Sequence, residues 1–362
     1  MPNMTENAYY KTPEEELTDH SQVDADHVFI SEETESIDSG KIPIWQQLTL
    51  LAVLLFLLLG GVITPTITAF FQNEADAIPA AVPVPQEDRN EFREVGQSQS
   101  SGIPFSNINL QAQAVYVWDV QNQRVLYKKN EQEVLPLASV TKLMTALVAH
   151  ELLEERAKVA IGNEAVAQYG NSGLSEGEVF NRLSLTDLTL MSSSNDGAYA
   201  LAAAAGNTLG TNGATAFVHA MNIRAEELGL HHTSFKNPTG LDTSETESGA
   251  LGSAKDMAFL MEHIVQHEPD ILTFTKTDQA RVYSEDGTYH DTENTNYYIN
   301  QIPGLIGSKT GYTDLAGGNL VVAFDAGLNR PIVITVLGST RHERFTDVIT
   351  LVEETQKQLT QE

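Results

Sequence analysis

The sequence predicts a single α/β domain that begins near residue 105 and continues to residue 362. Apolar, β-prone segments lie near both ends of this region, and the chain between them carries apolar residues at helical spacing. Strands at both ends with helices between them indicate one α/β domain, and the length is within the single-domain range. The expected strands are 114–120, 124–129, 317–326 and 330–339.

Each expected element has its own local signal. The segment AVYVWDV (114–120) alternates between the two faces of a strand, and QNQ can form the turn to the returning strand RVLYKK. Gly327-Leu328-Asn329 separates the second strand pair. A helix is expected to open near Ser139, because apolar residues then recur every three to four positions. The expected helices are 139–152, 185–192, 196–205, 214–228, 253–265 and 343–358.

The first 41 residues have a different composition. The whole chain has 49 acidic and 21 basic residues, a net charge of −28, and residues 1–41 are rich in Asp and Glu with few large apolar residues. Such a segment cannot bury enough apolar surface to offset its ordering entropy, so we expect an acidic disordered tail. No basic patch is present, which argues against nucleic acid as a partner. The absence of cysteine excludes a disulfide framework and thiolate metal sites.

Residues 42–72 contain no charged residue, and LTLLAVLLFLLLGGVI forms the centre of this stretch. About 20 apolar residues span the ~30 Å hydrocarbon layer, so we expect a transmembrane helix. A cleaved signal peptide and a buried core helix are the alternatives. Residues 73–104 are rich in Pro, Ala, Gln and Ser and are expected to form a flexible linker.

The helix expected from Ser139 contains an unusual pair. Ser139 and Lys142 are three residues apart, which places their Cβ atoms roughly 5–6 Å apart on one helix face. A lysine forced into a cleft loses hydration, and its pKa falls toward neutrality. The neutral amine can then take the serine proton and activate the hydroxyl as a nucleophile. A capping serine beside a surface lysine is the alternative interpretation.

Two further motifs follow in the chain. MSSSNDGAYAL contains Ser193-Ser194-Asn195, and IGSKTGYT contains Lys309-Thr310-Gly311. Ser-x-x-Lys, a Ser-x-Asn triplet and Lys-Thr-Gly, in this order, are the set shared by class A β-lactamases and penicillin-binding proteins. Because three serines are adjacent, the functional serine could also be Ser192 or Ser194. Asn195 could instead cap the helix that follows it.

The surrounding segments are more specific. FVHAMNIRAEELGLHHTSFKNPTGL (217–241), SAKDMAFL (253–260) and KTGYTDLAGGNLV (309–321) resemble the D-alanyl-D-alanine carboxypeptidases, the low-molecular-mass penicillin-binding proteins of peptidase family S11. The resemblance covers about residues 108–355. It implies a β-lactamase/DD-peptidase-like fold, in which helices flank an antiparallel sheet and a further subdomain is all helical.

The resemblance also implies roles for individual residues. Ser139 would form the acyl-enzyme, Lys142 would accept its proton, and Ser193 would relay a proton to the leaving group. Asn195 would hold the substrate backbone, and the backbone N–H groups of Ser139 and Tyr312 would form the oxyanion hole. The remaining expected substrate-binding residues are Lys309 and Thr310 for the terminal carboxylate, Gly311 for close approach of the substrate strand, and Arg344, with Arg341 as its alternative, for the same carboxylate.

The function implied is that of a membrane-anchored serine D,D-carboxypeptidase that removes the terminal D-alanine from peptidoglycan stem peptides. β-Lactam antibiotics would be covalent inhibitors, and neither a metal nor a cofactor is implied. Many family members have a C-terminal β-rich domain and anchoring helix; here residues 42–72 would contact the lipid bilayer instead. Because peptidoglycan lies outside the cytoplasmic membrane, residues 105–362 would be extracytoplasmic and residues 1–41 cytoplasmic.

Three alternative functions remain at this point. A D,D-endopeptidase that cleaves peptidoglycan cross-links would use the same motifs. A β-lactamase would need a dedicated deacylating glutamate, and the Glu-x-x-Leu-Asn pattern is missing. An inactive protein that binds cell-wall peptides would not require the complete motif set.

Overall fold

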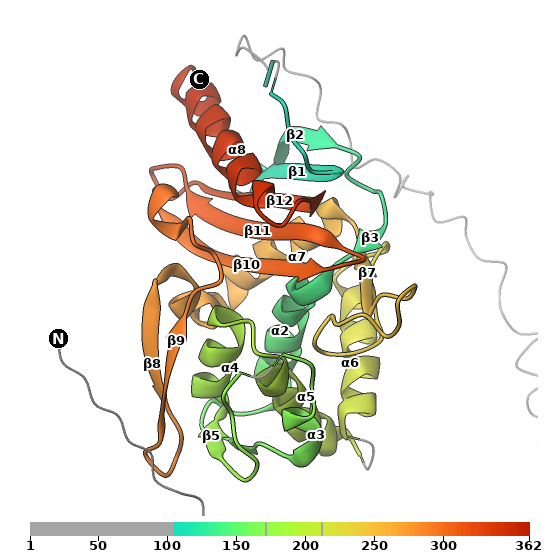
Figure 1. Ribbon diagram of the computed structural model, residues 1–362. Coiled ribbons are helices and arrows are strands. Elements are labelled where there is room, and N and C mark those ends of the chain that lie inside the picture. Colours follow the sequence, from blue (N-terminus) through green and yellow to red (C-terminus); the bar gives the residue numbers. More distant parts are fainter. Residues whose placement is uncertain (1–104, 107, 171, 211–212) are drawn as a thin grey trace, which may run out of the picture. The chain divides into compact units, whose positions relative to one another are not determined.

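The structure of the protein is a computed structural model that describes residues 105–106, 108–170, 172–210 and 213–362 (Figure 1). The expected tail, membrane span and linker, at 1–41, 42–72 and 73–104, lie outside the described residues. Within the described ranges, no helix has both the length and the apolar character needed to cross a membrane.

Four strands of the main sheet and the longer helices follow the order expected from the sequence, whereas β10 and several short elements were not among the expected ones. The strands are β1 (Ala114–Asp119), β2 (Arg124–Lys129), β3 (Leu135–Pro136), β4 (Lys158–Ala160), β5 (Val179–Asn181), β6 (Ser234–Phe235), β7 (Ala250–Gly252), β8 (Gln279–Tyr283), β9 (Tyr289–Glu293), β10 (Leu305–Thr313), β11 (Gly317–Asp325) and β12 (Pro331–Ser339). The α-helices are α2 (Lys142–Leu152), α3 (Asn163–Val166), α4 (Arg182–Met191), α5 (Asn195–Leu209), α6 (Gly213–Glu227), α7 (Ala254–His267) and α8 (Glu343–Thr360). Short 3-10 helices are η1 (Ala138–Thr141), η2 (Pro269–Lys276) and η3 (Ile299–Gln301).

The main sheet in the described part of the chain has five strands in the order β10-β11-β12-β1-β2, and its neighbours are antiparallel. The first and last strand pairs of the sequence therefore meet inside one sheet, through the pairing of β1 with β12. This arrangement confirms the antiparallel sheet flanked by helices that the resemblance implied. It also makes β10, which carries Lys309 and Gly311, an edge strand of that sheet.

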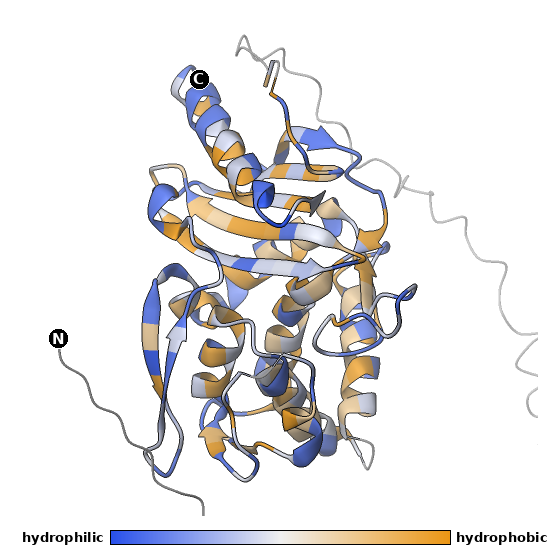
Figure 2. Ribbon diagram, in the orientation of Figure 1, coloured by the Kyte–Doolittle hydropathy of each residue, from blue (hydrophilic) through white to orange (hydrophobic). Residues whose placement is uncertain are grey.

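Both faces of this sheet are buried, and the alternation of side chains divides them between two cores. On β12, Ile334 packs into the core under α8, whereas Val333 packs into the core that α7 and the other helices share. Successive strand residues point to opposite faces, so a strand covered on both faces is apolar throughout. In Figure 1, α8 lies across one face of the sheet, and its turns alternate between orange and blue in Figure 2, as expected for a helix with one buried side.

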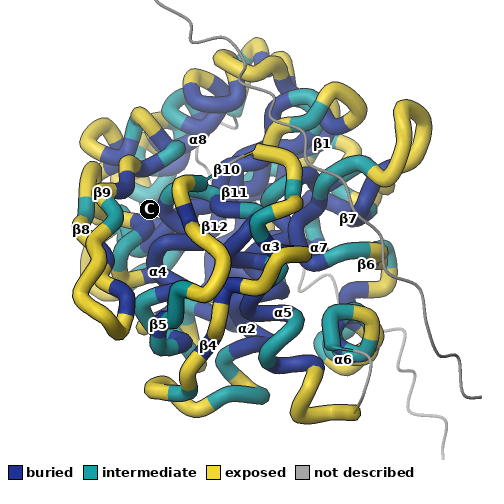
Figure 3. Tube along the Cα trace, turned by 60° about the horizontal axis from the view of Figure 1, so that its bottom comes forward, coloured by how far each residue is buried: buried dark blue, intermediate teal, exposed yellow. Residues whose placement is uncertain are grey.

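The helical part packs around α2, whose residues from Lys142 to Ala149 are all buried (Figure 3). Neighbouring helices start at side-chain caps, because Asn181 accepts the Ser184 N–H at the start of α4 and Ser194 accepts the Gly197 N–H at the start of α5. These caps fix the ends of two helices that meet close to the predicted site.

Some expected boundaries differ from those of the structure, and β10 and the smaller strands were not predicted. The helix expected from Ser139 is a 3-10 turn followed by α2, and the helix expected over 185–192 begins three residues earlier at Arg182. The β8–β9 hairpin was missed because its strands expose polar residues and lack a clean apolar alternation. β3 and β7 are too short to give a periodic signal.

Candidate active site

Ser139 and Lys142 lie on one tight turn at the entrance to α2. Ser139 belongs to η1, and Lys142 is the first residue of α2. Ala138, just before the serine, has φ of 48°, a left-handed conformation that is uncommon for a residue with a Cβ. The Lys142 Nζ lies 2.8 Å from the Ser139 Oγ. The distance is that of a hydrogen bond, so a proton can pass between the two atoms.

The surroundings of Lys142 favour an uncharged amine. Its side chain has no exposed surface, and burial lowers its pKa to about 7, opposed by the negative charge of Asp196. The Nζ also lies 2.6 Å from Asn195 Oδ1 and 2.8 Å from the Thr239 carbonyl, both of which can only accept hydrogen bonds. A neutral amine donates its two protons to these acceptors, which leaves its lone pair directed at Ser139.

The loop 237–241 packs against the turn that carries Ser139 and Lys142. The Asn237 Oδ1 accepts hydrogen bonds from the backbone N–H groups of Thr239 and Gly240, which closes the loop and presents the Thr239 carbonyl to Lys142. Gly240 has φ of 77°, and a Cβ there would lie 1.9 Å from the carbonyl oxygen of Ala138. Only glycine therefore allows the loop to pack directly against η1.

Of the three adjacent serines, Ser193 faces the site. It has φ of 61°, and its Oγ accepts a hydrogen bond of 2.9 Å from the Lys309 Nζ. Ser192 instead donates to the Leu188 carbonyl, and Ser194 caps α5. The structure therefore places Ser193, and neither of its neighbours, beside the Lys-Thr-Gly strand.

Asn195 is the first residue of α5, and Ser194 takes the capping position instead. The Asn195 Oδ1 accepts from Lys142, while its Nδ2 donates to the backbone carbonyl of Tyr169 at 2.7 Å. The side chain thus connects the buried amine to the loop that ends α3. This geometry does not agree with the capping role considered from the sequence.

Lys309 is also fully buried, beside Ser193 and the Thr310 carbonyl. Burial, reinforced by the positive charges of Lys142 and Arg344, lowers the pKa of Lys309 well below its usual range. Both amines of the site are therefore destabilised in their charged forms.

Gly311 lies directly against the nucleophile turn. A Cβ at this position would lie 2.8 Å from the Leu137 carbonyl oxygen and 3.2 Å from the Ser139 backbone nitrogen. The missing side chain is what lets β10 approach η1, and Tyr312 follows immediately with a half-exposed ring. The backbone expected to form the oxyanion hole is thus close to Ser139.

The two arginines differ in their environment. Arg344 is buried; its Nη1 donates to the Gly311 carbonyl at 2.6 Å, and burial lowers its pKa to about 10. Its Nε has no hydrogen-bond partner among the described residues. Arg341 is exposed and lies over the Tyr312 ring. In this structure, Arg344 supports the Lys-Thr-Gly strand, and its Nη1 is already engaged by the backbone.

Four residues of the site carried no role in the sequence analysis. The negative charge of Asp196 acts on Lys142, and the Thr239 carbonyl accepts a hydrogen bond from the Lys142 Nζ. Asn319 on β11 donates to the Pro136 and Leu137 carbonyls beside η1, and Thr295 contacts Thr310. The adjacent motifs could have drawn attention to Asp196 and Thr239, and Asn319 lies in the family-like segment 309–321, but no sequence signal links Thr295 to the site.

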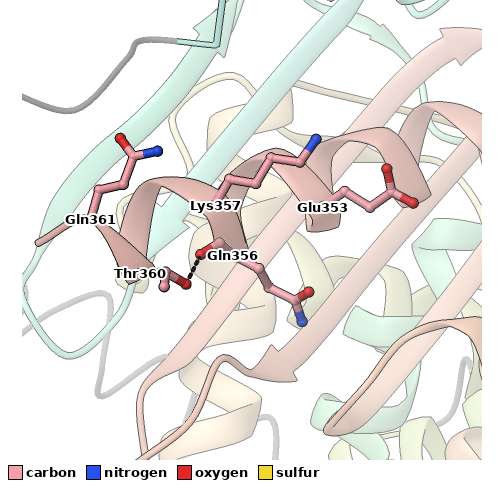
Figure 4. A pocket seen from close by; sticks show the side chains of 5 residues that line it. All are labelled: Glu353, Gln356, Lys357, Thr360 and Gln361. Carbon is pink, nitrogen blue, oxygen red and sulfur yellow. Dashed lines mark hydrogen bonds between the residues drawn. The ribbon is translucent and has the colours of Figure 1, made fainter.

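A surface depression of about 390 Å³ lies elsewhere, on α8 (Figure 4). The side chains that line it are exposed or half-buried and belong to the last turns of that helix and its C-cap: Glu353, Gln356, Lys357, Thr360 and Gln361. None of the residues of the three motifs contributes to it, so we assign it no part in the chemistry.

Comparison with known proteins identifies the family. The family profile of the D-alanyl-D-alanine carboxypeptidases, peptidase family S11, matches residues 99–341, and the chain belongs to this family. It is 32% identical over 263 residues to the D-alanyl-D-alanine carboxypeptidase DacF of Bacillus subtilis, a match that covers 71% of this chain and 65% of that relative. It is also 32% identical over 258 residues to a D-alanyl-D-alanine endopeptidase of Pseudomonas aeruginosa, covering 69% of this chain and 79% of that protein.

Solved structures share the fold. A D-alanyl-D-alanine carboxypeptidase of Mycobacterium tuberculosis aligns with a TM-score of 0.63 and 26% identity over 71% of this chain and 94% of that chain. Penicillin-binding protein D2 of Listeria monocytogenes, solved in its ampicillin-bound form, aligns with a TM-score of 0.59 and 28% identity over 68% of this chain and 98% of that chain.

Proposed function

We propose that the protein is a serine D,D-carboxypeptidase that removes the terminal D-alanine of peptidoglycan stem peptides and is acylated by β-lactams at Ser139. The observation that carries this proposal is the fully buried Lys142 amine, 2.8 Å from the Ser139 hydroxyl and hydrogen-bonded to Asn195. A capping serine and a surface lysine would not share this environment. The names of the relatives from Bacillus and Mycobacterium support the same activity.

Acylation follows from the contacts in the site. Neutral Lys142 takes the Ser139 proton, and the Oγ attacks the carbonyl carbon of the scissile peptide bond. The oxyanion accepts hydrogen bonds from the backbone N–H groups of Ser139 and Tyr312, each worth about 3 kcal/mol. The proton that Lys142 took then passes by way of the Ser193 hydroxyl to the D-alanine nitrogen, and the C–N bond breaks. A water molecule later hydrolyses the ester, which restores the Ser139 hydroxyl.

Substrate binding uses the edge strand β10. The terminal carboxylate of the peptide lies against Lys309 and Thr310, and its negative charge favours the protonated form of Lys309, which burial otherwise disfavours. Arg344 adds positive charge to this end of the site while it holds the Gly311 carbonyl. Asn195 offers its amide to the substrate backbone.

The test uses the detergent-solubilised full-length chain with fluorescent penicillin. We expect one covalent adduct, on Ser139, and none in the Ser139→Ala variant. A pentapeptide that ends in D-Ala-D-Ala should release free D-alanine, measured by mass spectrometry. A wild-type chain without an adduct would contradict the proposal.

A D,D-endopeptidase is the second candidate, favoured by the Pseudomonas relative, of which the match covers 79%. Both activities use the same acyl-enzyme, so the choice of substrate separates them. Cleavage of cross-linked dimers without release of D-alanine from the pentapeptide would favour the endopeptidase.

We further propose that residues 42–72 form a single transmembrane helix of a bacterial cell membrane, with residues 105–362 outside the cytoplasm. The uncharged apolar stretch and the extracytoplasmic location of peptidoglycan support this orientation. In intact spheroplasts, external protease should digest the region from 73 onward and leave residues 1–41 protected. Protection of the region from 105 onward would contradict the orientation.

A further inference from the structure

The segment 294–298, between β9 and η3, contacts the Lys-Thr-Gly strand β10 through Thr295 and Asn296. The Oγ1 of Thr295 lies 2.6 Å from the Oγ1 of Thr310. The backbone N–H of Thr295 donates to the carbonyl of Met191 at 3.1 Å. Met191 ends α4 and lies two residues before Ser193. Thr295 therefore connects the end of α4, next to Ser193, to β10, which carries Thr310.

Buried asparagines hold this segment in place. The Asn294 Nδ2 donates to the carbonyls of Thr275 and Thr277, and the Asn296 Nδ2 donates to the Ser308 Oγ. Both asparagine side chains are almost fully buried. The position of the Thr295 hydroxyl relative to Thr310 is therefore determined by the fold before any substrate arrives.

The number of hydroxyl protons determines which threonine is the donor in the Thr295–Thr310 contact. Each threonine hydroxyl has one proton to donate and can accept at its lone pairs, whereas a carboxylate can only accept. When the Thr310 hydroxyl donates to a substrate carboxylate, the 2.6 Å contact requires Thr295 to be the donor. The Met191 carbonyl, the other acceptor near the Thr295 Oγ1, is 3.5 Å away, which is long for a hydroxyl hydrogen bond.

We propose that Thr295 is a positioning residue for substrate recognition: its hydroxyl donates to Thr310 and thereby aims the single Thr310 proton at the C-terminal carboxylate of the peptide. The inference rests on the proposed function of the site. Without the Thr295 hydroxyl, the Thr310 side chain can rotate its methyl group toward the substrate. The hydrogen bond from Thr295 to Thr310, which strengthens the bond from Thr310 to the carboxylate, is also lost.

The experiment compares wild type with Thr295→Val, which keeps the shape of the side chain and removes the hydroxyl. Acylation of the full-length chain is measured with benzylpenicillin and with its methyl ester, which lacks the negative charge. We expect Thr295→Val to slow acylation by the free acid about tenfold, the effect of losing one hydrogen bond to a charged group, and to leave the ester rate unchanged. In pentapeptide hydrolysis, the loss should fall on KM more than on kcat.

Three further variants complete the test. Thr295→Ser keeps the hydroxyl and should restore the preference for the free acid. Thr292→Val removes a buried hydroxyl of the same region that contacts Met191 and Ala280, and it should change neither rate. In a Thr310→Val background, a further Thr295→Val change should have no effect, because the two hydroxyls act in series. Thr295→Ala replaces the valine variant if that chain does not fold.

The outcomes separate the two levels of the argument. Equal slowing with acid and ester, or additive losses in the double variant, would overturn the role of Thr295 while the proposed function stands. A wild-type chain that forms no adduct with either compound would overturn the proposed function and the inference with it.

Discussion

At the level of single residues, the environment of Lys142 sets the chemistry. A lysine without exposed surface usually lies against a carboxylate that neutralises it, yet the hydrogen-bond partners of this amine are a hydroxyl, an amide oxygen and a carbonyl. These acceptors favour the charged amine less than a directly bonded carboxylate would, so burial outweighs them and the pKa of Lys142 falls. The amine is therefore partly uncharged close to neutral pH, as its proposed role as base requires.

The pH dependence of acylation follows from this environment. The pKa of Lys142 is lowered to about 7, so the neutral, reactive amine is lost as the pH falls through that value. Acylation by penicillin should be nearly constant above pH 8 and fall about tenfold per pH unit well below pH 7. Rates measured by stopped flow with fluorescent penicillin test this, and a profile that is flat from pH 5 to 8 would contradict the role of Lys142 as base.

Asp196 modulates the same pKa. Its carboxylate raises the pKa of Lys142, against the effect of burial, and its Oδ1 has no hydrogen-bond partner in the described chain. In Asp196→Asn the negative charge is gone, so the acid limb of the acylation profile should move to lower pH. Asp187→Asn is the matched control, because Asp187 is buried with an unpartnered Oδ1 and is not among the charges that act on Lys142. A shift in the control alone would contradict this assignment.

At the level of elements, the site depends on the close approach of β10 to η1. In the proposed mechanism, backbone N–H groups of both segments bind one substrate oxygen, and a side chain between them would separate the strand from the turn. Gly311 on the strand and Gly240 on the loop that packs against η1 have no Cβ, which allows this close approach. The backbone atoms they contact cannot move as cheaply as a flexible side chain.

Gly311→Ala tests this approach. The added Cβ would lie 2.8 Å from the Leu137 carbonyl oxygen, so β10 must shift away from Ser139. We expect acylation to slow at least about a hundredfold, comparable to the loss of one oxyanion donor, while circular dichroism stays native. Gly162→Ala is the control, because a Cβ there meets nothing within 4 Å and its φ is −86°. Normal acylation by Gly311→Ala would contradict the close packing.

At the level of the whole molecule, the site lies where the sheet meets the helices around α2. Ser139 and Lys142 belong to the helical side, whereas Lys309 and Thr310 belong to the edge strand of the sheet. The Asn319 side chain connects the two sides: its Nδ2 donates to the carbonyls of Pro136 and Leu137, and its Oδ1 accepts from the Gly338 N–H.

Asn319→Ala should therefore affect both stability and activity. Its removal leaves buried carbonyl and N–H groups without these partners, which costs about 2–4 kcal/mol of unfolding free energy. Urea unfolding measures the loss, and the penicillin acylation rate should fall as η1 loosens. Asn300→Ala, which removes only an exposed contact with Asp278, should cost less than about 0.5 kcal/mol. Equal stability of the two variants would contradict the connecting role.

The sequence by itself determined the α/β class, the strand pairs at both ends, and the three motifs, because alternation, helical spacing and short-range chemistry are local properties of a chain. The tertiary structure decided which serine of Ser192, Ser193 and Ser194 faces Lys309, and it engaged Arg344 with the Gly311 carbonyl. It also brought Thr295 to the site from a segment that shows no motif, and it gave Asn319 its contacts beside η1. Such contacts depend on how the sheet packs against α2, and burial, which sets the pKa of Lys142, exists only in the folded chain.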